Sequence, residues 1–453
     1  MKNLLPHRRN PSFWRVRLFA AALTSCAMAA PAVHAASHDT DASLAAPRSS
    51  KPLGGGLRFG AESLRFEAMR LSDHPQVRAA GALRGSWFAT IKAAQALELR
   101  VGLRTDADLQ EAADGRYSVV DAGWADSWLR WRSGDARVTA GMQTVLWGRV
   151  DAVSLIDRVS RVDLRRFALD ELKERRLPQP ALRWEQEWGF YASDLVVLAG
   201  FQNALQADRR SIWHPINRSQ AQVVGTAAQP ALTAFFLGAP LQQADHRAGG
   251  AALRLTHAGD GFDHGFTIGR TRQTLPFFAL DLAGNRVLAS QPYVRHVAVD
   301  GELVTDAVTW RAELAHTRDV PMTALSGVRL KANSTEFAGG VEFFPGGRDT
   351  RVNLQLLLRE VNTQETATVE LQRYASLSGE LETAFLQGAW KAALRVASAL
   401  NIHDVYLSPR VSYVGWEPHE IYLAGHYFKG EQRGFGGFFR DNNALALGFK
   451  TRF

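Results

Sequence analysis

Apolar and polar side chains alternate over one segment after another of this chain, and this period of two restricts what the chain can fold into. The clearest segment is 351–360, where leucine or valine occupies every even position from 352 to 358 and charged or amide side chains occupy most odd positions. The same pattern recurs in other segments, namely 97–104, 182–190, 195–201, 308–314 and 444–453. This period is that of a strand with one apolar face. Helical periodicity is nearly absent, so the sequence predicts an all-β protein.

The connections between the predicted strands alternate in length from residue 190 onward. The short connections are 192–193, 259–263, 301–305, 345–348, 387–388 and 417–418, with a further one at 133–136. The longer connections are 205–246, 275–292, 319–332, 361–373, 401–406 and 430–442. This rhythm is typical of a transmembrane up-and-down antiparallel β-barrel, with turns at one end and loops at the other. It predicts about eighteen strands over residues 57–453, with about sixteen as the alternative.

A targeting segment precedes the predicted strands. Five basic residues lie before an apolar stretch at 18–30, and the small residues Val33 and Ala35 flank a cleavage site, so residues 1–35 are a predicted signal peptide. Residues 36–56, rich in Ser, Ala, Pro and Gly, are a predicted flexible periplasmic leader. A lipoprotein-like cleavage before Cys26 is the alternative, and the sequence leaves it open.

With cleavage after Ala35, the mature chain has little net charge and no cysteine. Cleavage removes five of the 53 Lys and Arg residues, so the balance becomes 48 − 45 = +3, which gives no reason to expect nucleic acid as a partner. Because Cys26 is the only cysteine, the mature chain has no disulfide, thiolate metal site or cysteine nucleophile. The chain has no Gly-x-Ser-x-Gly, His-Glu-x-x-His or P-loop motif. We therefore predict neither an enzyme nor a cofactor.

The last ten residues end in an alternating strand that closes on Phe453. Outer-membrane barrels of Gram-negative bacteria commonly end in such a strand. This resemblance implies that Phe453 is the signal read by the barrel-assembly machinery, and that the protein lies in the outer membrane among its lipid and lipopolysaccharide. A homo-oligomer is an alternative to a monomer that the sequence leaves open.

One segment, Asp163 to Arg176, has helical periodicity and lies in the long connection 149–180. Apolar residues share one face, Asp163 suits the N-cap, and Pro178 follows the last turn. Because the segment is highly charged, we expect this short helix to fold inward and narrow the lumen; a helix in a surface loop is the alternative. The charged residues predicted for the constriction are Asp163, Arg165, Arg166, Arg175 and Arg176.

Residues 138–190 resemble a proteobacterial outer-membrane family known mainly as a domain of unknown function. The likeness is carried by the run 140–148, Asp157, the pair 163–164, and the segments 175–178 and 181–183. In that family an Asn-Pro-x-Asp element follows the strand, whereas Ser160-Arg161-Val162-Asp163 retains only the aspartate. The resemblance implies the fold and the location and leaves the substrate open.

The positions opposite the apolar faces predict the side chains that line the lumen. The basic ones are Arg100, Arg104, Arg183, Arg254, Arg311, Arg351, Arg359, Lys391 and Arg395, and the acidic ones are Glu98, Glu185, Glu187 and Glu313. Fixed cations in a narrow channel raise the local concentration of anions. The excess of nine to four therefore leads to the hypothesis of a preference for anions. The alternative is that the arginines pair with carboxylates of the lumen and loops.

Together these features predict an outer-membrane channel, porin-like, for passive diffusion of small polar solutes. Two alternatives stay open. The first is an exporter or facilitator of a polymer or lipid-like molecule that works with inner-membrane partners. The second is an adhesin or structural barrel whose long loop 205–246 binds a partner.

Overall fold

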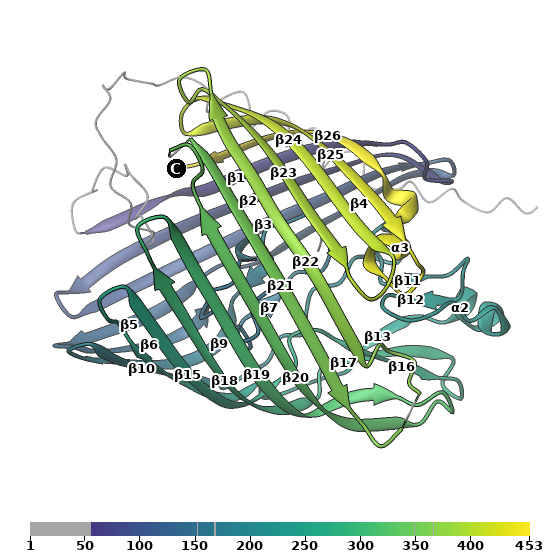
Figure 1. Cartoon of the computed structure of the whole chain (residues 1–453), viewed down its shortest axis with the longest axis horizontal. Helices are drawn as coiled ribbons and strands as arrows, with labels where there is room; N and C mark the ends of the chain where they lie inside the picture. Colours follow the sequence, from purple (N-terminus) through teal and green to yellow (C-terminus); the bar gives the residue numbers. More distant parts are fainter. Residues whose placement is uncertain (1–55, 152, 167–168, 348, 366) are drawn as a thin grey trace, which may run out of the picture. The chain divides into compact units, whose positions relative to one another are not determined.

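The computed structural model describes residues 56–453 apart from 152, 167–168, 348 and 366. The predicted signal peptide, residues 1–35, and the predicted leader up to residue 55 lie outside the described residues. The described chain forms one large antiparallel sheet in which the last strand pairs with the first, so the sheet closes into a barrel (Figure 1).

The first half of the barrel contains strands that differ widely in length. In chain order they are β1 (Leu57–Leu71), β2 (Val77–Ala94), β3 (Leu97–Ala112), β4 (Gly115–Trp124), β5 (Ser127–Ser133), β6 (Ala136–Gln143), β9 (Gln179–Trp188), β10 (Tyr191–Leu198), β14 (Gly250–His257) and β15 (Phe262–Arg272). The second half contains β18 (Tyr293–Val304), β19 (Val308–Thr323), β20 (Arg329–Phe343), β21 (Thr350–Asn362), β22 (Arg373–Phe385), β23 (Trp390–Ala399), β24 (Asp404–Trp416), β25 (His419–Gly430) and β26 (Ala444–Arg452).

The main sheet contains 19 strands, but β4 and β5 share one place in it. Both pair with β3, and the break between them lies at 125–126. There the carboxylate of Asp126 accepts a hydrogen bond from the Thr144 backbone N–H at 2.7 Å, just where the chain leaves β6. The barrel therefore has 19 − 1 = 18 strand positions, which confirms the predicted eighteen and excludes sixteen.

Short turns join the strands at one end and mostly longer connections at the other, as predicted, but several boundaries differ. The connection predicted at 205–246 spans 199–249, and the one predicted at 401–406 spans 400–403. The turn predicted at 192–193 lies at 189–190, where Gly189 takes a positive φ of 63°. The turn predicted at 301–305 lies at 305–307. The long connection predicted at 319–332 shrinks to 324–328, because β19 and β20 keep pairing beyond their last outward apolar residues.

The outward and inward faces of the strands differ as the alternation predicts. Outward residues such as Leu354, Leu358 and Leu381 are more than 40% exposed, because no other part of the described chain covers them. Exposed tryptophans, among them Trp188, Trp310 and Trp416, lie near the turn end. In lipid every backbone N–H and C=O needs an internal partner, and closure of the sheet supplies these partners. An apolar band with aromatic residues at its margin is the exterior expected in a bilayer.

The loop end carries several small elements. The long connection after β10 holds β11 (Ile216–Asn217), β12 (Gln222–Val223), η3 (Pro230–Leu232), α2 (Thr233–Gly238) and β13 (Leu241–Gln243), and the later connections hold β16 (Phe277–Asp281), β17 (Arg286–Ser290), α3 (Phe435–Phe438) and η4 (Arg440–Asn442). The ring of Trp213 lies 5.5 Å from that of Phe439 and 5.9 Å from that of Phe428, which places the long connection over β25. Within the described ranges, no helix is both long and apolar enough to cross a membrane.

Candidate functional site

The connection between β6 and β9, residues 144–178, folds into the barrel and is called the inward loop. It contains a two-residue hairpin of β7 (Arg161–Val162) and β8 (Arg176–Leu177), and one turn of helix, η2 (Lys173–Arg175). The inward fold and the short helix are confirmed, but the helix predicted from Asp163 to Arg176 is too long. The Asp163 backbone N–H donates to Arg175 O and that of Leu164 to Leu205 O, so contacts distant in sequence replace the local helical bonds.

Two carboxylates hold the base of the inward loop. Glu313 on β19 accepts backbone N–H groups of Arg149 at 2.7 Å, Val150 at 3.0 Å and Leu155 at 2.6 Å, and is 1% exposed. Asp157 accepts the backbone N–H of Trp147 at 2.5 Å and of Gly148 at 2.8 Å. Convergent backbone N–H groups form an anion nest, so these carboxylates act as internal anchors for the turn.

The first half of the inward loop packs its apolar side chains against the barrel wall. Val145, Val150, Ile156 and Val159 are all at most 3% exposed. They face a wall of small inward residues, which are Ala181, Ala252, Ala298, Ala315 and Ala338. Small side chains at these inward positions leave the space that the loop fills.

The second half of the inward loop binds the opposite wall through a group of charged side chains, called the ionic cluster. Its members are Arg65, Glu67, Arg84, Arg104 and Asp106 from β1–β3, and Asp163, Arg165, Arg166 and Asp170 from the loop. Asp170 lies 3.0 Å from Arg65 and 2.9 Å from Arg84, and Asp163 lies 2.7 Å from Arg104. Buried charges are tolerated when each has partners of opposite sign, as here.

The loop carboxylates of this region stay ionised over a wide pH range. Burial by itself raises the pKa of Asp163, but hydrogen bonds from Arg165 and the charges of Arg165 and Arg84 outweigh burial and lower that pKa. Burial by itself raises the pKa of Glu174, but nearby positive charges, that of Lys450 foremost, together outweigh burial. As a result, the pKa of Glu174 falls from 4.5 to about 2. Its contribution to stability is thus present above pH 4.5 and lost as the pH falls toward 2.

The Glu67→Gln substitution is expected to destabilise the folded barrel strongly. Glu67 is 1% exposed and holds Arg166, Arg65 at 3.1 Å and the Tyr422 hydroxyl at 2.5 Å. Removing one partner of a buried ion pair costs about 3–5 kcal/mol. The midpoint of thermal unfolding in detergent, followed by circular dichroism, measures this. Glu62→Gln, at a half-buried pair with Arg100, should cost less than about 1 kcal/mol; equal losses in both variants would contradict the prediction.

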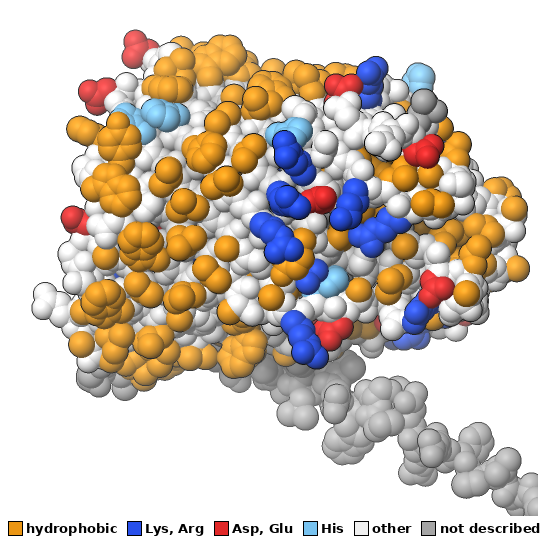
Figure 2. Space-filling model, turned by 90° about the horizontal axis from the view of Figure 1, so that it is seen from below, with side chains coloured by type: hydrophobic (Ala, Val, Ile, Leu, Met, Phe, Trp, Pro, Cys, Tyr) orange, Lys and Arg blue, Asp and Glu red, His pale blue; other side chains and the backbone are white. Residues whose placement is uncertain are grey.

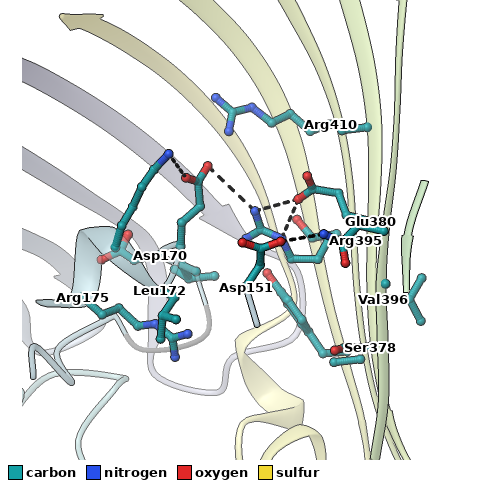
Figure 3. Close-up of a pocket in the computed structure, with 18 of the residues that line it drawn as sticks. Asp151, Asp170, Leu172, Arg175, Ser378, Glu380, Arg395, Val396 and Arg410 are labelled. Carbon is teal, nitrogen blue, oxygen red and sulfur yellow. Dashed lines mark hydrogen bonds and ion pairs between the residues drawn. The ribbon is translucent and has the colours of Figure 1, made fainter. Parts of the chain in front are cut away.

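The inward loop leaves part of the lumen free, and this part includes a cavity of about 880 Å³. It lies between the loop and the inner faces of β21–β26. Its lining runs from Asp404 and Phe435 at the loop end to Pro418 and Arg452 at the turn end. Figure 3 shows Asp170, Leu172 and Arg175 of the loop across from Glu380, Arg395 and Arg410 of the wall.

The cavity lining is charged but electrically balanced. Its cations are Arg65, Lys173, Arg175, Arg351, Lys391, Arg395, Arg410, Lys450 and Arg452, and its anions are Glu67, Asp151, Asp157, Asp170, Glu171, Glu380, Glu382, Asp404 and Glu420. Glu171 of the loop lies 4.0 Å from Arg395, which lies 3.1 Å from Glu380. Oppositely charged groups thus reach across the lumen from loop to wall.

The predicted pore-lining residues fall into two groups. Arg351, Lys391 and Arg395 line the cavity. The other predicted positions lie elsewhere on the inner wall, and most make ion pairs there: Arg100 with Glu62, Arg104 with Asp106 and Asp163, Arg183 and Glu185 with each other, Arg254 with Asp300, Arg311 with Glu302, and Arg359 with Glu336. Glu98 approaches Arg130 and Arg132, Glu187 is exposed near the turn end, and Glu313 anchors the loop.

Of the residues predicted for the constriction, Arg175 lines the cavity. Asp163, Arg165 and Arg166 lie in the ionic cluster, and Arg176 is 3.8 Å from Asp157. The alternation missed Asp170, Glu171 and Lys173, which line the cavity, because they belong to an irregular loop. Phe453 follows β26 and donates its backbone N–H to Glu62 O; its role as an insertion signal stays a prediction.

Comparison with known proteins supports the fold and gives no sequence family. No protein-family model matches the sequence, so the resemblance of residues 138–190 to a sequence family finds no support there. No curated protein sequence matches it either. Among solved structures, OccK7 (OpdD) of Pseudomonas aeruginosa matches at 9% identity and a TM-score of 0.50, over 88% of this chain and 98% of that chain.

OccAB1 of Acinetobacter baumannii matches at 9% identity with a TM-score of 0.50, over 90% of this chain and 99% of that chain. The chain has the fold of Gram-negative outer-membrane porins. At this identity the likeness concerns the fold alone, so the solute must be argued from the lumen of this chain.

Proposed function

We propose that this protein is an outer-membrane channel through which small polar solutes diffuse passively between the inward loop and the β21–β26 wall. The observation that carries the proposal is the cavity of about 880 Å³, whose lining residues extend from one end of the barrel to the other. The charged lining favours polar solutes over a lipid-like cargo. The proposal requires no cofactor and no catalytic step.

We infer little preference for the sign of the solute charge. Nine cations and nine anions line the cavity, and the basic side chains Arg351, Lys391 and Arg395 each lie within 3.2 Å of a glutamate. Paired charges produce a weaker field than isolated ones. The anion preference that the excess of basic residues predicts is therefore less well supported than passage of neutral or zwitterionic polar solutes.

The proposal is tested by recording from purified, refolded protein in planar bilayers. We expect stepwise current increases in potassium chloride, and a reversal potential close to zero in a salt gradient. Polar organic ions small enough for the cavity should also carry current, whereas bulky ones should not. Absence of any conductance steps from folded, inserted protein would overturn the proposal.

Arg395→Glu is expected to shift the reversal potential toward cation selectivity. The change replaces a cation that faces Glu171 and Glu380 with a third carboxylate, so the lining gains a local excess of negative charge. The cation-to-anion permeability ratio should rise roughly twofold or more. Arg100→Glu is the matched control, because Arg100 lies beside Glu62 and outside the cavity lining. An equal shift in both variants would place the path elsewhere.

A further inference from the structure

Three arginines form a row across adjacent strands on the outside of the barrel. Arg270 on β15 is the direct partner of Arg295 on β18, which is the direct partner of Arg318 on β19. All three are exposed, and the Arg295 side chain is 68% exposed. Like charges directly opposite one another destabilise a sheet. Uncharged polar side chains would suit this surface without mutual repulsion. A row of three arginines therefore indicates a partner that supplies negative charge.

Further cations flank this row with little compensation. The outer basic patch consists of Arg270, Arg272, Arg295, Arg318, Arg329 and Lys331. Within the described residues, Asp319 is the one carboxylate that pairs with any of them, 3.3 Å from Arg295 and 3.9 Å from Lys331. Six cations and one anion leave the patch with a charge of 6 − 1 = +5. The lumen arginines, by contrast, nearly all have carboxylate partners.

The patch lies where the outward apolar face of these strands ends. Ile268 and Val297, two positions from Arg270 and Arg295 toward the turn end, are exposed and apolar. Figure 2 shows the blue side chains gathered in the middle of this face, with the hydrophobic side chains of the turn end to their left. With the short turns in the periplasm, as in the general design of outer-membrane barrels, this level is the headgroup layer of the outer leaflet.

Ring contacts hold part of the patch in place. The Tyr293 ring lies 4.4 Å from the Arg270 guanidinium carbon and 4.1 Å from that of Arg272. Arg272 also donates to Ala248 O at 2.6 Å and Gln291 O at 3.0 Å, whereas Arg318 makes no ion pair within the described ranges. Guanidinium groups on a rigid sheet match the oxygens of a phosphate bidentately.

We propose that the outer basic patch binds the phosphate groups of a phosphorylated glycolipid of the outer leaflet, of the lipid A class, with its acyl chains along the apolar face next to the patch. The patch requires several anionic groups on the ligand, and the apolar face beside it requires hydrocarbon chains directly next to those groups. A phosphorylated glycolipid of this class meets both requirements. The inference depends on the outer-membrane location and not on transport, so failure of one proposal leaves the other standing.

The test uses full-length mature protein in detergent micelles and native mass spectrometry with bisphosphorylated lipid A as the probe. We expect wild-type protein to retain lipid A and to release it at high salt. The affinity of the triple variant R270Q/R295Q/R318Q for lipid A should be lower than that of wild type by a factor of roughly ten or more. The matched control R58Q/R116Q/R132Q removes three charges from scattered exposed positions and should bind normally.

Dephosphorylated lipid A should bind to the wild-type protein no more tightly than it binds to the triple variant. Equal binding of both lipids, equal binding by wild type and triple variant, or equal retention of phosphatidylglycerol and lipid A would each overturn the proposal. If the triple variant fails to fold, the single variant R318Q and the salt dependence of wild-type binding provide the same comparison. Conductance of the triple variant in phosphatidylcholine bilayers should match wild type, which separates lipid binding from transport.

Discussion

Replacing residues 145–177 with a short Gly-Ser linker is expected to raise the single-channel conductance roughly twofold or more. The inward loop occupies the sectors in front of β1–β3 and β18–β20, and the cavity of about 880 Å³ lies on the β21–β26 side. An 18-strand barrel is too wide for wall side chains to fill, so removal of the loop leaves an aqueous pore. Gln143 and Gln179 are cross-strand partners, so a short linker can join the strands without changing their register.

The same variant should pass bulky organic ions that wild type excludes, which planar-bilayer recordings in solutions of large cations and anions would measure. Trimming the connection between β21 and β22, residues 363–372, is the matched control, because it lies at the loop end and contributes no residue to the cavity lining. Unchanged conductance after removal of the inward loop in a folded barrel would show that the loop does not narrow the path.

Glu313→Ala is expected to convert a steady open current into a fluctuating one with larger mean conductance. The substitution leaves the backbone N–H groups of Arg149, Val150 and Leu155 without their acceptor in a buried region. Each unsatisfied buried donor costs roughly 1–3 kcal/mol. The base of the loop should therefore detach from β19, while the barrel, held by its own ladder, stays folded.

Single-channel noise analysis at fixed voltage measures this effect. Glu185→Ala is a suitable control, since Glu185 is an inward carboxylate whose partners Arg137 and Arg183 are both on the wall. Glu313→Gln, which retains one carbonyl acceptor, should lie between wild type and Glu313→Ala. A Glu313→Ala current as quiet as that of wild type would mean that other contacts, such as Arg149 with Asp300, suffice to hold the loop.

Strand alternation predicts the barrel correctly because lipid imposes one simple rule on each outward residue. Segment 351–360 obeys this rule and coincides with β21. The rule fails to predict the ends of strands that extend past the apolar band. The outward residues Arg318 and Lys331 are charged, so the apolar pattern ends there although β19 and β20 continue to pair. Boundaries at the loop end are consequently the least predictable part of the fold.

The interior obeys no such rule, which is why the candidate site was only partly predictable. Ala298 and Ala315 are inward residues directly opposite one another, in a position where a water-filled lumen favours polar side chains. This pair indicates that another segment packs there, but strand alternation alone does not reveal it. Conversely, the charges between Asp163 and Asp170 read as a helix, because sequence periodicity cannot show that their partners lie on β1–β3, about a hundred residues away.

The pairing of β1 with β26 has a consequence for how the molecule is made. Nine cross-strand partners, from Ser63 with Arg452 to Leu71 with Ala444, join the first strand to the last. A chain cut short anywhere before this final segment exposes two unpaired borders, each a template for association with other unfinished chains. The ring can therefore close only after the entire polypeptide, up to and including β26, is present.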